Sequence, residues 1–351
     1  MRAVRFNVTP RVAPGQHIGA VDELKGLAIA LIVLYHGEAV LGLSNWVHGE
    51  IGVDIFLILS GFTLAMNAVD MPLSQFFLRR FLRIYPTYWL ALGATLWLQK
   101  RLYASTKSWD NIWQHIVGIH GYSRLVYFSD ISDPFWFISL IAAAYLAFAC
   151  IRRRLDDLSL VIAVAGALTL GATYGYYVNG HTGGLISLAI RIPSFFVGVI
   201  AGRLLCSGTA ELRFNLVLGF GLLCFYVQTF FLNTTNNYTL PALGIIAAWL
   251  GMRHYMVMTH QGRVFLAAFA LLGLISYEIY LFHQPIIRDY NPYFFVHVLN
   301  VPAPSKVQLL RGIFAGMGLT LAVSAAVHRA TEWMWSLFGI RGAGRLAGAK
   351  G

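Results

Sequence analysis

Charged side chains are scarce in this chain of 351 residues. Asp, Glu, Lys and Arg together make up 12% of it, whereas hydrophobic residues make up 58%. Soluble domains carry about 25% charged residues, so this chain has too few ionised side chains to cover the surface of a soluble protein of its size. The same composition excludes a disordered chain, which is rich in charge and poor in apolar residues. We therefore expect an all-α, polytopic membrane protein, whose outer surface faces lipid.

Cysteine is also scarce, and the cysteines that occur are badly placed for a shared role. Cys150, Cys206 and Cys224 are an odd number, lie far apart and include no C-x-x-C pair. A disulfide framework and a thiolate metal site are therefore both disfavoured. The sequence also contains no internal repeat, which argues against a fibrous or repeat architecture.

Acidic residues are few relative to basic ones. The chain has 15 Asp and Glu against 26 Lys and Arg, so its net charge is +11. In a soluble protein this excess would suggest a nucleic-acid partner. In a membrane protein it is better explained by basic loops that lie against an anionic lipid leaflet. We therefore expect the lipid bilayer, and no nucleic acid, as the partner of these loops.

Long apolar runs dominate the rest of the sequence, and ten of them approach the roughly 20 residues that a transmembrane helix needs. They lie at 24–43, 51–69, 84–99, 135–151, 158–178, 184–205, 214–232, 238–257, 264–287 and 308–328. This pattern predicts a bundle of about ten transmembrane helices within residues 21–335, with cytoplasmic tails at 1–20 and 336–351. The longest linker, 100–134, is rich in Trp and Tyr, so we expect it to lie at the membrane interface.

The distribution of basic residues predicts the orientation of this bundle. With the N-terminus inside, the cytoplasmic segments hold about 17 Lys and Arg and the opposite segments about 6, which agrees with the positive-inside rule. The hairpins 43–50, 179–183 and 233–237 contain no Lys or Arg. Both termini are therefore predicted to be cytoplasmic.

Ionisable side chains inside a span are costly, so each one suggests a function. Lys25 and His36 are eleven residues apart in the first predicted span, which is about three helical turns, so they share a face and lie about 16 Å apart along the axis. Glu38 follows His36, and Asp54 of the second span is expected at the same depth. Such a carboxylate could hold the imidazole in one tautomer, as a general base requires. The alternative is a structural His–Asp pair that only joins two helices.

Three arginines cluster where the third predicted span begins. Arg79 and Arg83 are four residues apart, and Arg80 and Arg83 are three apart, so they are neighbours on a helix. Guanidinium groups at a helix N-terminus make a phosphate-binding surface. The alternative is a topology anchor, because cytoplasmic loops are generally basic.

Further polar residues interrupt later spans. Tyr277, Glu278 and His283 lie in the ninth predicted span, and Arg191 lies in the sixth. Costly residues on several helices favour a shared polar cavity over separate structural pairs. The histidines lie on different predicted helices without an H-x₃-H pair, so we expect no metal.

Two other classes of protein remain possible on these residues alone. A proton- or anion-coupled transporter would also place His, Asp and Glu at mid-depth, and it would predict paired repeats and broken helices. A binding or scaffold protein would explain the basic loops but not the buried polar residues.

Four motifs together resemble a known family, the acyltransferase 3 family of integral membrane O-acyltransferases. The motifs are Leu24-Lys25-Gly26-Leu27 with His36, Gly52-Val53-Asp54-Ile55-Phe56 with Leu59-Ser60-Gly61-Phe62, Arg79 to Trp89 (RRFLRIYPTYW), and Ser276-Tyr277 with Tyr280 to Pro285 (YLFHQP). They occur in the family's order, and the resemblance spans roughly residues 20–335.

This resemblance implies a ten-helix enzyme that moves an acyl group, usually acetyl, from cytoplasmic acyl-coenzyme A to a hydroxyl of an exported or surface carbohydrate. The acceptor would be a polysaccharide or glycolipid, and the location a bacterial cytoplasmic (inner) membrane. His36 matches the family's catalytic histidine, and Arg80 and Arg83 match the arginines that meet the coenzyme. Lys25 stands where the family typically has Arg, and it keeps the charge but loses the planar guanidinium.

The remaining candidate residues follow from the resemblance together with the polar residues named above. Glu278 stands where the family commonly has Ser, and Trp136 begins a stretch that fits the family's fourth-span motif. We expect His36 to deprotonate the acceptor directly or to carry the acyl group briefly, with Asp54 orienting it and His283 or Tyr277 donating to the oxyanion. The residues expected to bind the substrate are Glu38, Glu278, Trp136 and Arg191. The acceptor, the acyl group and the oligomeric state stay open.

Overall fold

The computed structural model describes residues 18–43, 48–122, 131–178, 183–207, 238–301 and 303–337, and within these ranges it contains helices and no strand. The long helices are α1 (Gly19–Val40), α2 (Ile51–Asn67), α3 (Leu73–Tyr103), α5 (Trp136–Ile151), α6 (Leu158–Val178), α7 (Gly183–Ser207), α9 (Thr239–Met256), α10 (His260–Leu274) and α13 (Lys306–Leu337). Nine of the ten predicted spans coincide with helices, and the run at 214–232 lies outside the described residues. The all-α class is therefore confirmed.

Fewer helices than ten are apolar and long enough to cross a membrane. In the described part of the chain three qualify, Asp133–Arg154, Leu158–Val178 and Lys306–Leu337, and a fourth if one bent pair is counted as a span. The other predicted spans differ for physical reasons, since α2 has only 17 residues and α3 contains the arginines. The ten-span layout and the cytoplasmic termini therefore stay predictions.

The bent pair corrects the prediction of one continuous span at 264–287. Helix α10 ends at Leu274 and α11 (Ser276–Gln284) begins after Ile275, and the two parts are bent by 68°. The Ser276 hydroxyl donates to the Gly273 carbonyl at 2.8 Å across the bend. Two π-helical stretches, Pro285–Tyr290 and Phe294–Val298, follow α11 and flank the short α12 (Asn291–Tyr293).

The linker predicted at 100–134 contains its own helix, α4 (Trp109–Val117). The Ser108 side chain caps its N-terminus, and Gly118, with φ of 84°, ends it. Trp109 is exposed, as expected at an interface. Behind this face the rings of His115 and His120 are buried and stack with centroids 3.9 Å apart.

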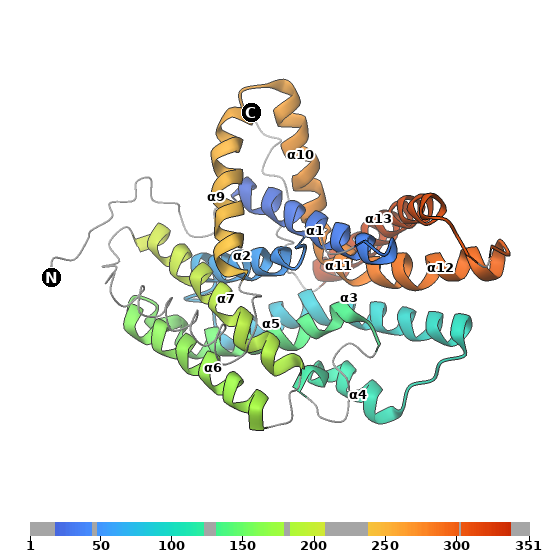
Figure 1. Cartoon of the computed structure of the whole chain (residues 1–351). Helices are drawn as coiled ribbons and strands as arrows, with labels where there is room; N and C mark the ends of the chain where they lie inside the picture. The colour runs from blue at the N-terminus through green and yellow to red at the C-terminus, as the bar shows by residue number, and fades with distance from the viewer. Residues whose placement is uncertain are drawn as a thin grey trace.

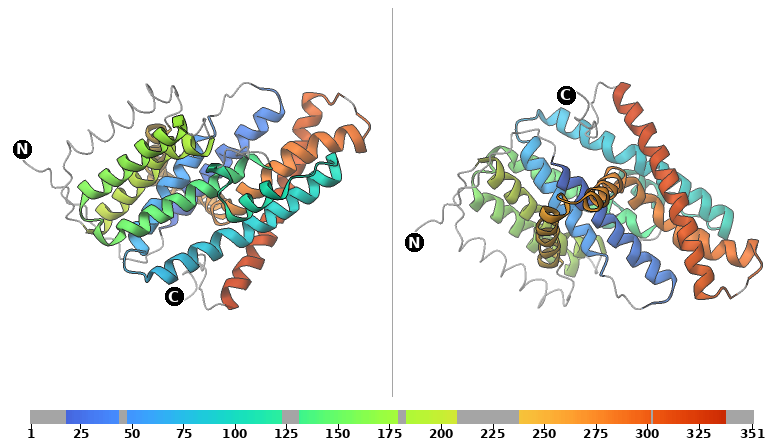
Figure 2. Two further views of the ribbon diagram at one scale, coloured as in Figure 1. Left: turned by 90° about the horizontal axis from the view of Figure 1, so that it is seen from below. Right: turned by 90° about the horizontal axis from the view of Figure 1, so that it is seen from above.

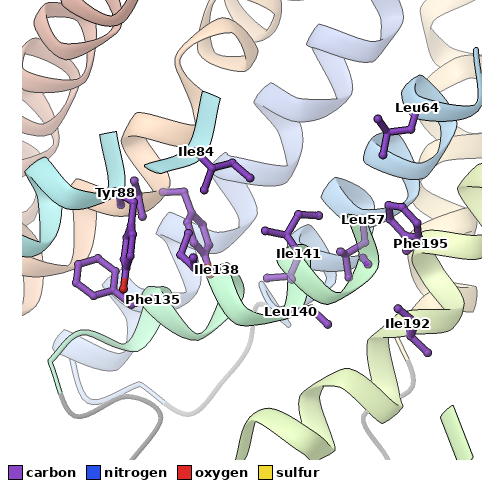
Figure 3. Packing of buried hydrophobic residues seen from close by; sticks show 14 of the residues in the cluster. Leu57, Leu64, Ile84, Tyr88, Phe135, Ile138, Leu140, Ile141, Ile192 and Phe195 are labelled. Carbon is purple, nitrogen blue, oxygen red and sulfur yellow. The ribbon is translucent and has the colours of Figure 1, made fainter. Parts of the chain in front are cut away.

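The main hydrophobic core lies between α2, α3, α5 and α7. Figure 3 shows this packing, with the labelled side chains pointing toward one another. They are Leu57, Leu64, Ile84, Tyr88, Phe135, Ile138, Leu140, Ile141, Ile192 and Phe195. Helices α6 and α7 lie on one side of the molecule and α13 on the other, while α9 and α10 project as a hairpin (Figures 1 and 2).

Glycines allow α2 and α7 to cross closely. A Cβ on Gly61 would lie 2.0 Å from the Phe195 carbonyl oxygen, and one on Gly198 would lie 1.9 Å from the Ile58 oxygen. No real Cβ tolerates such distances, so only glycine fits at this crossing. Two helical turns take about seven residues, and each glycine lies seven residues after a polar residue of the site described below, Asp54 or Arg191.

Candidate active site

The two histidines singled out in the sequence meet in the structure. The rings of His36 on α1 and His283 on α11 have centroids 5.0 Å apart and planes at 48°. His283 is fully buried, with 0% of its surface exposed, while His36 is half-buried. We call these residues the histidine pair.

Backbone contacts determine the tautomer of His283. Its Nδ1 lies 3.0 Å from the Ile279 carbonyl oxygen and 2.9 Å from that of Tyr280. Carbonyl oxygens only accept hydrogen bonds, so Nδ1 carries the proton and Nε2 carries a lone pair. Among the described residues this Nε2 has no hydrogen-bond partner. In this neutral tautomer Nε2 accepts and the Nδ1–H is already used, so donation to an oxyanion would require a protonated ring, and that role of His283 stays a prediction.

Tyr277 does not reach the histidine pair with its hydroxyl either. That hydroxyl donates to the Ile84 carbonyl at 2.9 Å and so joins α11 to α3. Because a phenol has one proton to donate, the structure does not support Tyr277 as the oxyanion donor.

Asp54 has partners other than His36. Its carboxylate forms an ion pair with Arg191 and accepts a hydrogen bond from the Ser194 hydroxyl at 2.5 Å. Asp54 is 1% exposed and Arg191 is 6% exposed. Arg191 also binds the Glu50 carboxylate at 2.8 Å. We call Glu50, Asp54, Arg191 and Ser194 the Arg191 network. The sequence predicted that Asp54 orients His36, whereas in the structure its carboxylate binds Arg191 and Ser194.

The Arg191 network brings together two residues predicted to bind the substrate. The Arg191 guanidinium carbon lies 5.3 Å from the centroid of the Trp136 ring and 5.6 Å from that of Tyr238. Both rings lie within cation–π distance of this cation. The Arg191 network supplies two carboxylates and one guanidinium, and two aromatic rings lie beside it.

Polar residues just before α5 and at the end of α11 form a second group of ionic contacts. Asp133 forms an ion pair with Arg288 and accepts a hydrogen bond from the Gln284 amide at 2.6 Å. Arg288 in turn lies within Coulombic range of His36. This ion pair places a compensated cation beside the histidine pair.

Lys25, Arg80 and Arg83 gather near the start of α1 and the first half of α3. Lys25 lies within Coulombic range of both arginines and donates to the Asp22 carboxylate at 3.0 Å. The Arg80 guanidinium carbon lies 5.7 Å from the centroid of the Tyr145 ring, and its buried Nε has no hydrogen-bond partner within the described ranges. We call Lys25, Arg80 and Arg83 the cation cluster.

Arg79 takes a different position from the cation cluster. It is exposed and lines a separate cavity of about 400 Å³ with Arg203 and Asp70. The arginines of the predicted phosphate-binding surface are thus divided between two places.

The two predicted glutamates also have defined places. Glu278 is buried, and its carboxylate binds Nδ1 of His328 from α13 at 3.0 Å. Its other oxygen is buried and has no hydrogen-bond partner in the part of the chain that the structure describes. Glu38 is half-buried on α1, two residues beyond His36.

Sequence reasoning missed Glu50, Ser194, Asp133, Arg288 and His328. Glu50 and Asp54 are four residues apart, a spacing that puts both on one helix face, so this signal was present. Ser194 and Arg288 offered no comparable signal, because their importance depends on partners distant in the chain. Among the described residues, no group of three or more His, Cys, Asp or Glu could hold a metal ion.

Fold and site together define an all-helical protein in which the described helices include three long and apolar enough to cross a membrane, and in which several basic residues are buried. The profile of the acyltransferase domain family, acyltransferase 3, matches residues 18–329.

Relatives agree with this match. The chain is 26% identical over 287 residues to ORF330 of the Acidianus two-tailed virus, provisionally named an acetyltransferase, covering 79% of this chain and 83% of the relative. It is 25% identical over 320 residues to BcsY of Komagataeibacter xylinus, provisionally named a membrane-bound transacylase, covering 79% and 75%. A stretch of 84 residues is 31% identical to the peptidoglycan O-acetyltransferase OatA of Listeria monocytogenes, covering 22% of this chain and 13% of OatA. No solved structure gives a significant match.

The chain therefore belongs to the acyltransferase 3 family. It is an O-acyltransferase, and like its family it is associated with membranes.

Proposed function

We propose that this enzyme transfers an acyl group, acetyl in the first instance, from cytoplasmic acyl-coenzyme A to a hydroxyl of an exported or surface carbohydrate. The observation that carries the proposal is the histidine pair, a half-buried imidazole on α1 packed 5.0 Å from a fully buried one on α11. Two neighbouring imidazoles inside an apolar bundle suit proton transfer.

The cation cluster is the proposed site of the donor's phosphates. Arg80 offers a buried Nε that lacks a partner in the described residues, so an anionic oxygen would complete its hydrogen bonding. Lys25 and His36 lie about 16 Å apart along α1, a span that the long pantetheine arm of coenzyme A suits. The thioester would then reach His36.

In the proposed reaction His36 acts as the general base. The acceptor hydroxyl gives its proton to His36, its oxygen forms the new ester bond to the acyl carbon, and the carbon–sulfur bond breaks. The coenzyme leaves as the thiolate with that electron pair and takes up the proton. In the second version of this mechanism, His36 first displaces the thiolate and carries the acyl group as an acyl-imidazole.

The acceptor is proposed to bind on the side of the Arg191 network, together with Trp136 and Glu38. Aromatic rings and paired charges offer both stacking and hydrogen bonds to a sugar. The peptidoglycan O-acetyltransferases of Listeria monocytogenes and Bacillus subtilis, which match short stretches of this chain, act on a carbohydrate hydroxyl by name and support this choice. Glu278, on α11 like His283, is bound by His328.

The layout proposed for this reaction is a ten-helix bundle over residues 21–335 in a bacterial cytoplasmic membrane, with tails 1–20 and 336–351 inside. Its donor side faces the cytoplasm, where acyl-coenzyme A is made.

The test is release of free coenzyme A by purified protein. With acetyl-coenzyme A and glycerol as a small hydroxyl acceptor, we expect thiol release above that of a protein-free sample, and His36→Ala should abolish this excess because the hydroxyl proton then has no acceptor. His260→Asn, at an exposed position on α10, is the matched control and should keep full activity.

Full activity of His36→Ala would remove His36 from the mechanism. Absence of thiol release by the wild-type protein would favour the transporter alternative, which predicts broken helices such as the bent pair α10 and α11.

A further inference from the structure

His283 has a lone pair with no assigned use at the centre of the site. Its Nδ1–H is shared between the carbonyls of Ile279 and Tyr280, one turn back on α11, at 3.0 and 2.9 Å. The main chain of α11 therefore keeps the proton on Nδ1 and leaves Nε2 as an acceptor. This Nε2 is buried, and the described residues give it no partner.

The neighbouring ring lies where it could supply that partner. Two imidazoles joined by an N–H···N bond of about 2.9 Å, with each nitrogen about 1.1 Å from its ring centre, have centroids about 5.1 Å apart. The rings of His36 and His283 are 5.0 Å apart. Catalytic hydrogen bonds are often open in a free enzyme and close when substrate binds.

We propose that His283 is the positioning residue of His36: its Nε2 accepts the N–H of His36 and so turns the opposite, unprotonated nitrogen of His36 toward the acceptor hydroxyl. This inference rests on the proposed function. It assigns to a neutral imidazole the task that a carboxylate performs in a Ser-His-Asp triad.

The surroundings of the pair favour an imidazole over a carboxylate in this position. Asp54 is already bound by Arg191 and Ser194, and Asp133 by Arg288 and Gln284. Two aromatic rings also lie against the pair, with the Tyr35 ring 5.2 Å from His36 and the Tyr280 ring 6.2 Å from His283.

A neutral partner also changes the route of the proton. When His36 takes the acceptor's proton, its other N–H can pass to Nε2 of His283, so the positive charge moves away from the new ester. The proton returns through His36 to the coenzyme thiolate, which restores both neutral rings and completes the balance.

Two substitutions of His283 separate its two nitrogens. In His283→Asn the amide N–H can still donate to the α11 carbonyls, but no acceptor stands at the Nε2 position. In His283→Gln the amide oxygen stands near Nε2 and accepts a hydrogen bond without holding a proton. With acetyl-coenzyme A and glycerol as acceptor, we expect kcat to fall roughly 100-fold in His283→Asn and about 10-fold in His283→Gln, with the donor KM unchanged in both.

A second readout does not depend on activity. In protein labelled with ¹⁵N-histidine, the wild type should show His283 protonated on Nδ1 and His36 in one tautomer, and His283→Asn should show His36 in both. A wild-type His283 protonated on Nε2 would overturn the inference. So would a wild-type kcat in folded His283→Asn, or a raised donor KM with kcat unchanged.

Failure here can be told from failure of the proposed function. If His36→Ala is inactive while His283→Asn is fully active, only the role of His283 fails. If the wild-type protein releases no coenzyme A, the proposed function fails, whereas the ¹⁵N spectra still report the tautomers.

Discussion

Most of the charged side chains at this site form an ion pair with an oppositely charged side chain. Arg191 is held by two carboxylates, and Lys25 by Asp22. Arg80 differs, because it is half-buried beside two aromatic rings and keeps a guanidinium nitrogen without a partner in the described ranges. A buried donor left unsatisfied costs about 1–3 kcal/mol, a cost that a bound anion would remove.

At the scale of these residues, a titration with the donor acetyl-coenzyme A tests whether Arg80 and Arg83, unlike Arg79, bind its phosphates. We expect Arg80→Ala combined with Arg83→Ala to raise the KM for acetyl-coenzyme A roughly 10- to 1,000-fold, since each charge-assisted contact contributes about 1.5–3 kcal/mol and the two are partly coupled. Arg79→Ala is the matched control, because Arg79 is exposed and lines another cavity. An unchanged KM in the double variant, or an equal rise in Arg79→Ala, would leave these arginines as topology anchors.

At the scale of elements, the crossing of α2 and α7 holds the Arg191 network in place. Gly61 follows Asp54 by seven residues, and Gly198 follows Arg191 by seven, so each glycine lies on the same helix face as its polar residue. The close backbone contact at Gly61 and Gly198 therefore sets the distance over which Asp54 and Arg191 meet.

We expect Gly198→Ala to weaken this crossing, because its Cβ would meet the Ile58 carbonyl at 1.9 Å. Overpacking of this kind costs about 1–3 kcal/mol, and the helices must separate near Asp54. Gly171→Ala on α6 is the control: nothing lies within 4 Å of its Cβ, and Ala favours a helix by about 1 kcal/mol. Thermal unfolding in detergent should therefore show a lower midpoint for Gly198→Ala only. Equal or raised stability of Gly198→Ala would mean that α2 and α7 are not this close.

At the scale of the whole molecule, orientation decides which compartment supplies the donor. Lys25 of the cation cluster and His36 of the histidine pair lie toward opposite ends of α1, so with the cation cluster on the inner side the histidine pair lies toward the outer side. Basic residues in the predicted inside loops favour that orientation.

Reporter fusions test this orientation directly. We expect fusions within 43–50 and 179–183 to report the outside, because neither hairpin contains Lys or Arg. A fusion after residue 335 serves as the inside control. Cytoplasmic signals from both hairpins would invert the layout and move the donor to the other compartment.

The sequence predicted much of this site because helix periodicity is local. The stripe from Lys25 to His36 and the spacing of Arg80 and Arg83 depend only on neighbours in one helix, and the structure places these residues in the cation cluster and the histidine pair. Asp54 was identified for the same reason, but the sequence paired it with His36 and the structure pairs it with Arg191. Depth along α2 does not reveal which neighbouring helix its side chain faces. The bend at Ile275 was missed because the apolar pattern continues across it.

The amino-acid sequence by itself determined that this chain is helical, apolar and built for acyl transfer, because composition, helix spacing and motifs are properties of the chain alone. Only the tertiary structure decided that Arg191 pairs with Asp54, that Tyr277 binds the Ile84 carbonyl, and that the ring of His283 lies beside that of His36. Those outcomes depend on how helices distant in the chain cross, and the crossings are set by glycine contacts between backbones.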